Sequence, residues 1–77
     1  MNFYIICDKD CYTLFPQNEY SMGRNSDIYL DILKVYTVNV EADKITLDNK
    51  EYKPGVHNVK LETANIKIII LKKEDYY

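Results

Sequence analysis

The run Arg24, Asn25 and Ser26 carries side chains that suit contact with an anion. A guanidinium presents forked N–H donors that match the oxygens of a phosphate, and an amide and a hydroxyl follow it directly. The acidic residues nearby offer an alternative, in which Arg24 forms a surface ion pair with Asp27 or Asp31. On the sequence alone, both interpretations stay open.

No group of residues predicts catalysis. His57, the one histidine, follows a Pro-Gly pair in an expected surface loop, without a nucleophile motif nearby. The carboxylates are scattered over turns, and the two glycines, Gly23 and Gly55, are too few for a phosphate-binding loop. Cys7 and Cys11 with one histidine do not complete a four-ligand metal site. We therefore expect no enzymatic activity, no cofactor and no metal.

Length and composition indicate one small globular domain. The chain has 77 residues, 47% of them hydrophobic, and a net charge of −2 without a basic block, which disfavours both disorder and nucleic-acid binding. No signal peptide is visible, and apolar runs such as residues 68–71 are far too short to span a bilayer. Two cysteines favour free thiols, with a disulfide across the intervening turn as the alternative.

Alternating apolar residues and short turn signals predict strands throughout. Isoleucine, valine, threonine and tyrosine dominate, and no segment has a sustained helical period. We therefore expect an all-β sandwich of short, mainly antiparallel strands over residues 1–72, with residues 73–77 as the start of a linker or tail. The expected strands span residues 3–7, 11–15, 20–22, 28–30, 35–40, 44–48, 51–53 and 66–71. Residues 56–61 are expected as a further strand or an extended segment, with a turn at 63–65.

The same alternation assigns residues to an inner and an outer side. We expect the core to contain Ile5, Leu14, Met22, Ile28, Val38, Ile45, Leu47, Leu61, Ile66, Ile68 and Ile70. We expect an outward apolar patch, of the kind that often marks a surface for a protein partner, at Tyr4, Tyr12, Tyr29, Ile69 and Leu71.

The Met-Gly-Arg run at residues 22–24 and the Asp-Ile-Tyr-Leu run at residues 27–30 resemble the opening of a forkhead-associated (FHA) domain. The resemblance implies a β-sandwich in which Arg24 supports phosphopeptide-binding loops, with Asn25 and Ser26 beside it. Phosphothreonine-reading members also carry a Ser, an Arg and a His soon afterwards, and later an Asn next to a Gly. Residues 31–37 contain none of the first three, and no Gly follows Asn49. The chain therefore departs from the family where phosphate is read.

This combination is similar to the degenerate FHA-like domains at the N-terminus of membrane-bound FtsK/SpoIIIE-type ATPases of type VII secretion systems in Gram-positive bacteria. The resemblance implies a non-catalytic, cytoplasmic protein-interaction module, held at the inner face of the membrane by its parent protein. Its partners would be other components of the secretion machinery, and the ATPase activity would lie in other domains. Two alternatives remain: a working phosphopeptide-binding FHA domain, and a small free-standing β-protein that acts as an inhibitor or adaptor.

Overall fold

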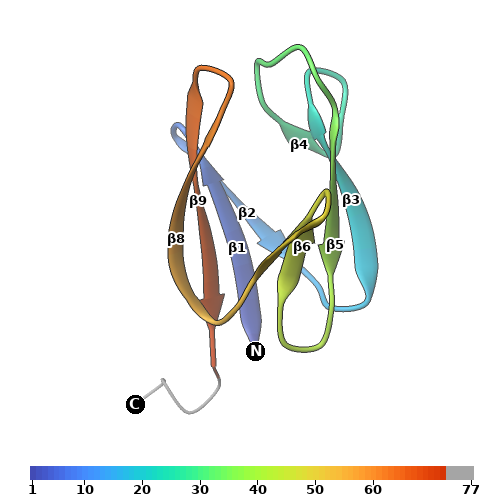
Figure 1. Cartoon of the computed structure of the whole chain (residues 1–77), viewed down its shortest axis with the longest axis vertical. Helices are drawn as coiled ribbons and strands as arrows, with labels where there is room; N and C mark the ends of the chain where they lie inside the picture. The colour runs from blue at the N-terminus through green and yellow to red at the C-terminus, as the bar shows by residue number, and fades with distance from the viewer. Residues whose placement is uncertain (73–77) are drawn as a thin grey trace.

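The computed structural model describes residues 1–72, which form nine strands and no helix. Two sheets face each other and enclose one core, so the predicted β-sandwich is confirmed (Figure 1). The strands are β1 (Asn2–Cys7), β2 (Asp10–Leu14), β3 (Asn18–Gly23), β4 (Ile28–Tyr29), β5 (Tyr36–Val40), β6 (Ile45–Leu47), β7 (Lys50–Tyr52), β8 (Gly55–Leu61) and β9 (Ala64–Leu71).

The first sheet has the strand order β2-β1-β9-β8, and the second has the order β4-β3-β5-β6-β7. All neighbouring strands are antiparallel except β3 and β4, which run parallel with Met22 opposite Ile28. The loop of residues 24–27 therefore connects β3 to a short parallel strand, β4, at the edge of the second sheet. This arrangement places the β3–β4 and β4–β5 loops next to each other at one end of the sandwich (Figure 1).

Three hairpins close through turns of two residues, at positions 8–9, 48–49 and 62–63. The first residue of each turn, Asp8, Asp48 or Glu62, has a positive φ of 53° to 58°, which short hairpin turns require. The turn expected at residues 63–65 was placed one residue too late. Ala64 already pairs with Leu61 and begins β9, because Glu62 takes the strained turn position.

The core confirms the inward assignment made from alternation. All eleven expected residues are buried, and Ile68, in the central strand β9, has no exposed surface. Cys7 and Tyr52 are also buried, as is Ile32, which lies in the segment between β4 and β5. Three more residues complete the core: Phe3, Leu30 and Val40.

The predicted linker or tail at residues 73–77 lies outside the described residues. Within residues 1–72, no helix is long and apolar enough to cross a membrane.

Candidate interaction surfaces

Arg24 lies in the loop between β3 and β4, and its Nε donates to Oδ1 of Asp31 at 2.7 Å. Both side chains are more than half exposed, so the pair contributes about 0–1 kcal/mol to stability. Asp27, the other candidate partner, instead accepts hydrogen bonds from the backbone N–H and the hydroxyl of Ser21. The ion pair of Arg24 is therefore formed with Asp31 and not with Asp27.

Asn25 and Ser26 share the loop but face different surroundings. Ser26 is half-buried and packs against Gly23, where an added Cβ would lie 3.3 Å from the Ser26 Oγ. Asn25 is exposed. The loop therefore presents one exposed amide beside a guanidinium that already has a carboxylate partner.

Glu62 joins the β8–β9 turn to the loop between β4 and β5. Its carboxylate accepts hydrogen bonds from the backbone N–H of Lys34 at 3.0 Å and from that of Leu33 at 3.0 and 3.1 Å. These bonds, aided by the nearby charge of Arg24, lower the pKa of Glu62. Successive backbone N–H groups form a concavity that suits an anion. Here the chain's own carboxylate fills it.

Asp48, in the β6–β7 turn, contacts Lys34 in the loop between β4 and β5 and Thr37 in β5. Its Oδ1 accepts from the Thr37 N–H at 2.9 Å, and its Oδ2 lies 3.0 Å from the Lys34 Nζ. The backbone bond and the Lys34 ammonium lower the pKa of Asp48. Because Arg24 is paired as well, the cations of the β3–β4 and β4–β5 loops both have carboxylate partners.

The outer face of the first sheet is apolar and carries positive charge. Tyr4 lies opposite Ile69, and Ile69 lies opposite Val56, so an apolar row crosses three strands. Two lysines, Lys60 and Lys67, lie on the same face between this row and the β8–β9 turn, and none of the carboxylates of residues 1–72 lies on the face. By strand alternation its residues are Asn2, Tyr4, Ile6, Cys11, Thr13, Val56, Asn58, Lys60, Asn65, Lys67, Ile69 and Leu71.

Three of the five predicted partner residues, Tyr4, Ile69 and Leu71, lie together on this face. The prediction for Tyr12 was wrong: it lies opposite buried Ile5 and packs against the core. The two-residue turn sets the pairing between β1 and β2, and this pairing turns Tyr12 inward. Its hydroxyl accepts a hydrogen bond from the N–H of Tyr29 at 3.2 Å.

The remaining predicted partner residue, Tyr29, is 53% exposed but belongs to β4 in the second sheet. It therefore does not extend the apolar row. The sequence prediction also missed Val56, which is 58% exposed. Alternation back from Leu61, which was expected in the core, places Val56 outward, so the signal was present in the sequence.

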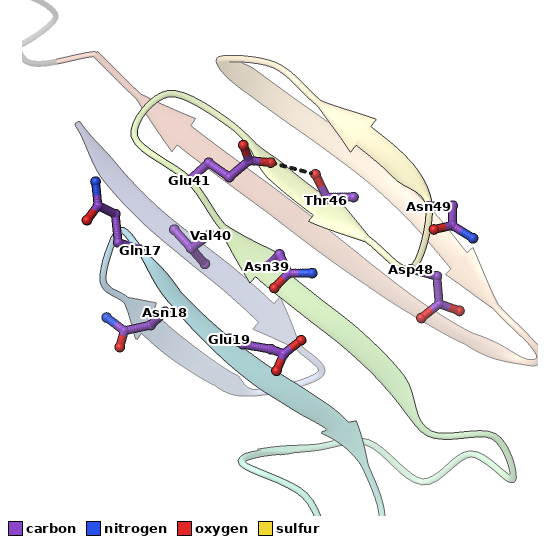
Figure 2. Close-up of a pocket in the computed structure, with 9 residues that line it drawn as sticks. All are labelled: Gln17, Asn18, Glu19, Asn39, Val40, Glu41, Thr46, Asp48 and Asn49. Atoms are coloured by element: carbon purple, nitrogen blue, oxygen red, sulfur yellow. Dashed lines mark hydrogen bonds between the residues drawn. The ribbon is translucent and has the colours of Figure 1, made fainter.

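The outer face of the second sheet has the opposite character. A shallow hollow of about 550 Å³ lies on it, lined by amide, hydroxyl and carboxylate side chains (Figure 2). Thr46 lies opposite Asn39, which lies opposite Glu19, and the Thr46 hydroxyl donates to Glu41 at 3.2 Å. Small-molecule sites are mostly apolar and enclosed, so this hollow is a poor one. Residues 1–72 contain no cluster of three or more His, Cys, Asp or Glu placed to hold a metal ion.

His57 was expected in an exposed loop, and that expectation was wrong. It lies in β8, opposite Ile68, with its ring edge-on to Tyr52 at 5.2 Å between centroids. Its Nε2 lies 2.6 Å from the Lys53 carbonyl oxygen and therefore donates to it. The ring fills the side of the sandwich between β7 and β8, which is a structural role.

Comparison with known proteins does not assign the chain to a family. The sequence matches no family model, and neither a curated protein nor a solved structure matches it significantly. The features that bear on function are therefore the two outer faces and the loop end, by which we mean the end of the sandwich that carries the β3–β4 and β4–β5 loops.

Proposed function

We propose that this chain is a non-catalytic protein-interaction domain that docks a protein partner through the outer face of the first sheet. The observation that carries the proposal is the composition of that face. The row Tyr4, Ile69 and Val56 is contiguous, and no carboxylate of residues 1–72 interrupts the face. Contiguous apolar patches on small proteins often mark interaction sites.

The more specific form of the proposal is an FHA-like domain of a type VII secretion ATPase. The parent protein would hold it in the cytoplasm at the inner face of the membrane, where its partners are other secretion components. Support comes from the resemblance at residues 22–30, whose Met-Gly pair ends β3 and whose Ile28 begins β4, within a β-sandwich. Sequencing the gene beyond codon 77 tests this form. A stop codon there favours the alternative of a small free-standing inhibitor or adaptor.

We further propose that the domain does not read phosphothreonine. A phosphate carries nearly two negative charges and three strong acceptors, which several convergent donors must satisfy. Here Arg24 is paired with Asp31, Lys34 with Asp48, and the N–H groups of residues 33–34 with Glu62. To bind a phosphate, Arg24, Lys34 and the N–H groups of residues 33–34 would have to break their contacts with these carboxylates.

Titration with phosphothreonine peptides and their unphosphorylated forms tests this proposal. We expect weak binding that is the same for both forms and unchanged in Arg24→Ala, because an exposed pair contributes only about 0–1 kcal/mol. Micromolar, phosphate-dependent binding that disappears in Arg24→Ala would overturn it and restore the alternative of a working phosphopeptide reader.

Docking through the first sheet is tested by site-specific photo-crosslinking in the cells that make the protein. A crosslinking amino acid at position 69 should capture a partner protein, since Ile69 lies in the middle of the apolar row. The matched control is position 46, because Thr46 lies on the outer face of the second sheet. Equal capture at both positions, or none at position 69, contradicts the proposal.

A further inference from the structure

We propose that the free edge of β8 accepts an extended, acidic strand of the protein partner, which adds to the first sheet as a fifth strand. This inference rests on the proposed function and specifies how the partner docks. Strand addition to an open sheet edge is a common mode of peptide recognition, in which the main chain supplies affinity and alternate side chains supply specificity.

The edge of β8 is the longest free edge of the described residues. Four strands lie at sheet edges, and β8 has 7 residues, whereas β2, β7 and β4 have 5, 3 and 2. A long unpaired edge presents a row of N–H and C=O groups that another chain is able to pair with. β8 therefore offers the most extended template.

The register shows which backbone groups of β8 point outward. The two-residue turn closes on the pair Leu61 and Ala64, and such closing pairs are hydrogen-bonded. Because hydrogen-bonded and non-bonded pairs alternate in an antiparallel ladder, the N–H and C=O groups of Val56, Asn58 and Lys60 face away from β9. These three residues also place their side chains on the outer face of the first sheet.

Space for an added strand exists along this edge. A groove of about 650 Å³ lies between β7 and β8, lined by Lys50, Glu51, Tyr52 and residues 56–60. The contact of the His57 ring with Tyr52 and with the Lys53 carbonyl closes the core behind the groove. A strand that pairs with β8 therefore meets an open edge and leaves the sandwich closed.

The side chains next to this edge select an acidic strand. On the outer face, Lys60 lies two residues beyond Asn58 in β8 and Lys67 lies directly opposite Asn58 in β9. Neither lysine forms an ion pair with a described residue. An antiparallel strand would place its outward side chains beside Lys60, Asn58 and Val56 in turn. The complementary pattern is thus acidic, acidic and apolar at every second position.

The test is a nuclear magnetic resonance titration of the 77-residue protein with the synthetic peptide acetyl-TETETVT-amide. We expect saturable shifts centred on the amides of Val56, Asn58 and Lys60. Asn58→Pro removes one outward N–H and spares the ladder with β9, so the affinity should fall at least about tenfold. The matched control is Thr13→Pro, at the outward position of the opposite edge strand β2, which should bind as the unchanged protein does.

Charge reversal tests the acidic preference separately. The double variant Lys60→Glu and Lys67→Glu should bind acetyl-TETETVT-amide at least about tenfold more weakly, because facing like charges oppose association. The peptide acetyl-TKTKTVT-amide should show the reverse order, with tighter binding to the double variant. Equal binding of both peptides to both proteins contradicts an acidic partner.

Three outcomes would overturn the inference. One is the absence of saturable binding at about 1 mM peptide, and another is binding that Asn58→Pro leaves unchanged. The third is self-association that Asn58→Pro abolishes, which would make a second copy of this chain the occupant. If Asn58→Pro leaves crosslinking at position 69 intact, the result supports docking through the outer face of the first sheet but contradicts strand addition at the edge of β8. If the protein without Asn58→Pro gives no crosslinking at position 69, both the proposed docking face and the edge inference are contradicted.

Discussion

At the scale of single residues, the two cysteines show how a sheet separates neighbouring side chains. Cys7 is buried in the core, whereas Cys11 is exposed on the outer face of the first sheet, and both are free thiols. Burial raises the pKa of Cys7 to about 11, and the carboxylates of Asp8 and Asp10 add to the shift. The thiolate is the reactive form, so the folded chain keeps Cys7 unreactive.

Alkylation with iodoacetamide near neutral pH should therefore modify Cys11 alone in the folded protein. In denaturant, where Cys7 is exposed and its pKa returns toward the ordinary value of about 8.5, both cysteines should react. Mass spectrometry of the modified peptides gives the site and the rate. Modification of Cys7 at the same rate as Cys11 in native buffer would show that β1 opens readily.

At the scale of elements, β9 organises the first sheet because it pairs with both β1 and β8. Ile68 lies at its centre and has no exposed surface, whereas Ile69, the next residue, faces outward. The two isoleucines thus allow the inner and outer sides of one strand to be compared with the same chemical change.

Ile68→Ala should lower the free energy of unfolding by roughly 2–5 kcal/mol, since it removes buried methyl groups and leaves a cavity. Ile69→Ala should cost about 1 kcal/mol or less, because its side chain is partly exposed. Urea unfolding followed by circular dichroism measures both values. A loss well under 1 kcal/mol for Ile68→Ala would contradict the burial of this face.

At the scale of the whole molecule, Glu62 connects the two sheets. It belongs to the β8–β9 turn of the first sheet and accepts hydrogen bonds from residues 33–34, which lead into the second sheet. Figure 1 shows this turn and the loop between β4 and β5 at the same end of the sandwich. The contact makes part of the stability depend on pH.

The pKa of Glu62 is lower in the folded chain than its ordinary value of 4.5. A lowered pKa means that the ionised form stabilises the fold. This stabilisation is fully present above the unfolded pKa and is lost as the pH falls through the folded value. Between about pH 6 and about pH 3, the melting temperature should therefore fall more for the unchanged protein than for Glu62→Gln.

The matched control for this comparison is Glu19→Gln, because Glu19 is exposed on the outer face of the second sheet. It should follow the unchanged protein across the whole pH range, as judged by thermal unfolding monitored with circular dichroism. If Glu62→Gln and Glu19→Gln lose the same amount of stability on acidification, the contact between the sheets does not hold in solution.

The fold class, most of the strands and most of the core were predictable from the amino-acid sequence. Alternation of apolar residues is a local property, so the inner side of β1, β5 or β9 follows from a few consecutive residues. The same local pattern placed Tyr4, Ile69 and Leu71 outward, where the structure has them. These three residues of the proposed docking face were thus predictable without a structure.

Features that depend on how distant segments pair could not be predicted from local sequence patterns. The direction of Tyr12 depends on the length of the turn after β1, and the contact of Glu62 with Leu33 spans 29 residues. The free edge of β8 exists because the chain passes to the other sheet after β7. These outcomes are set by turn geometry and by the choice of strand partners, which a one-residue change in register alters completely while the local pattern stays the same.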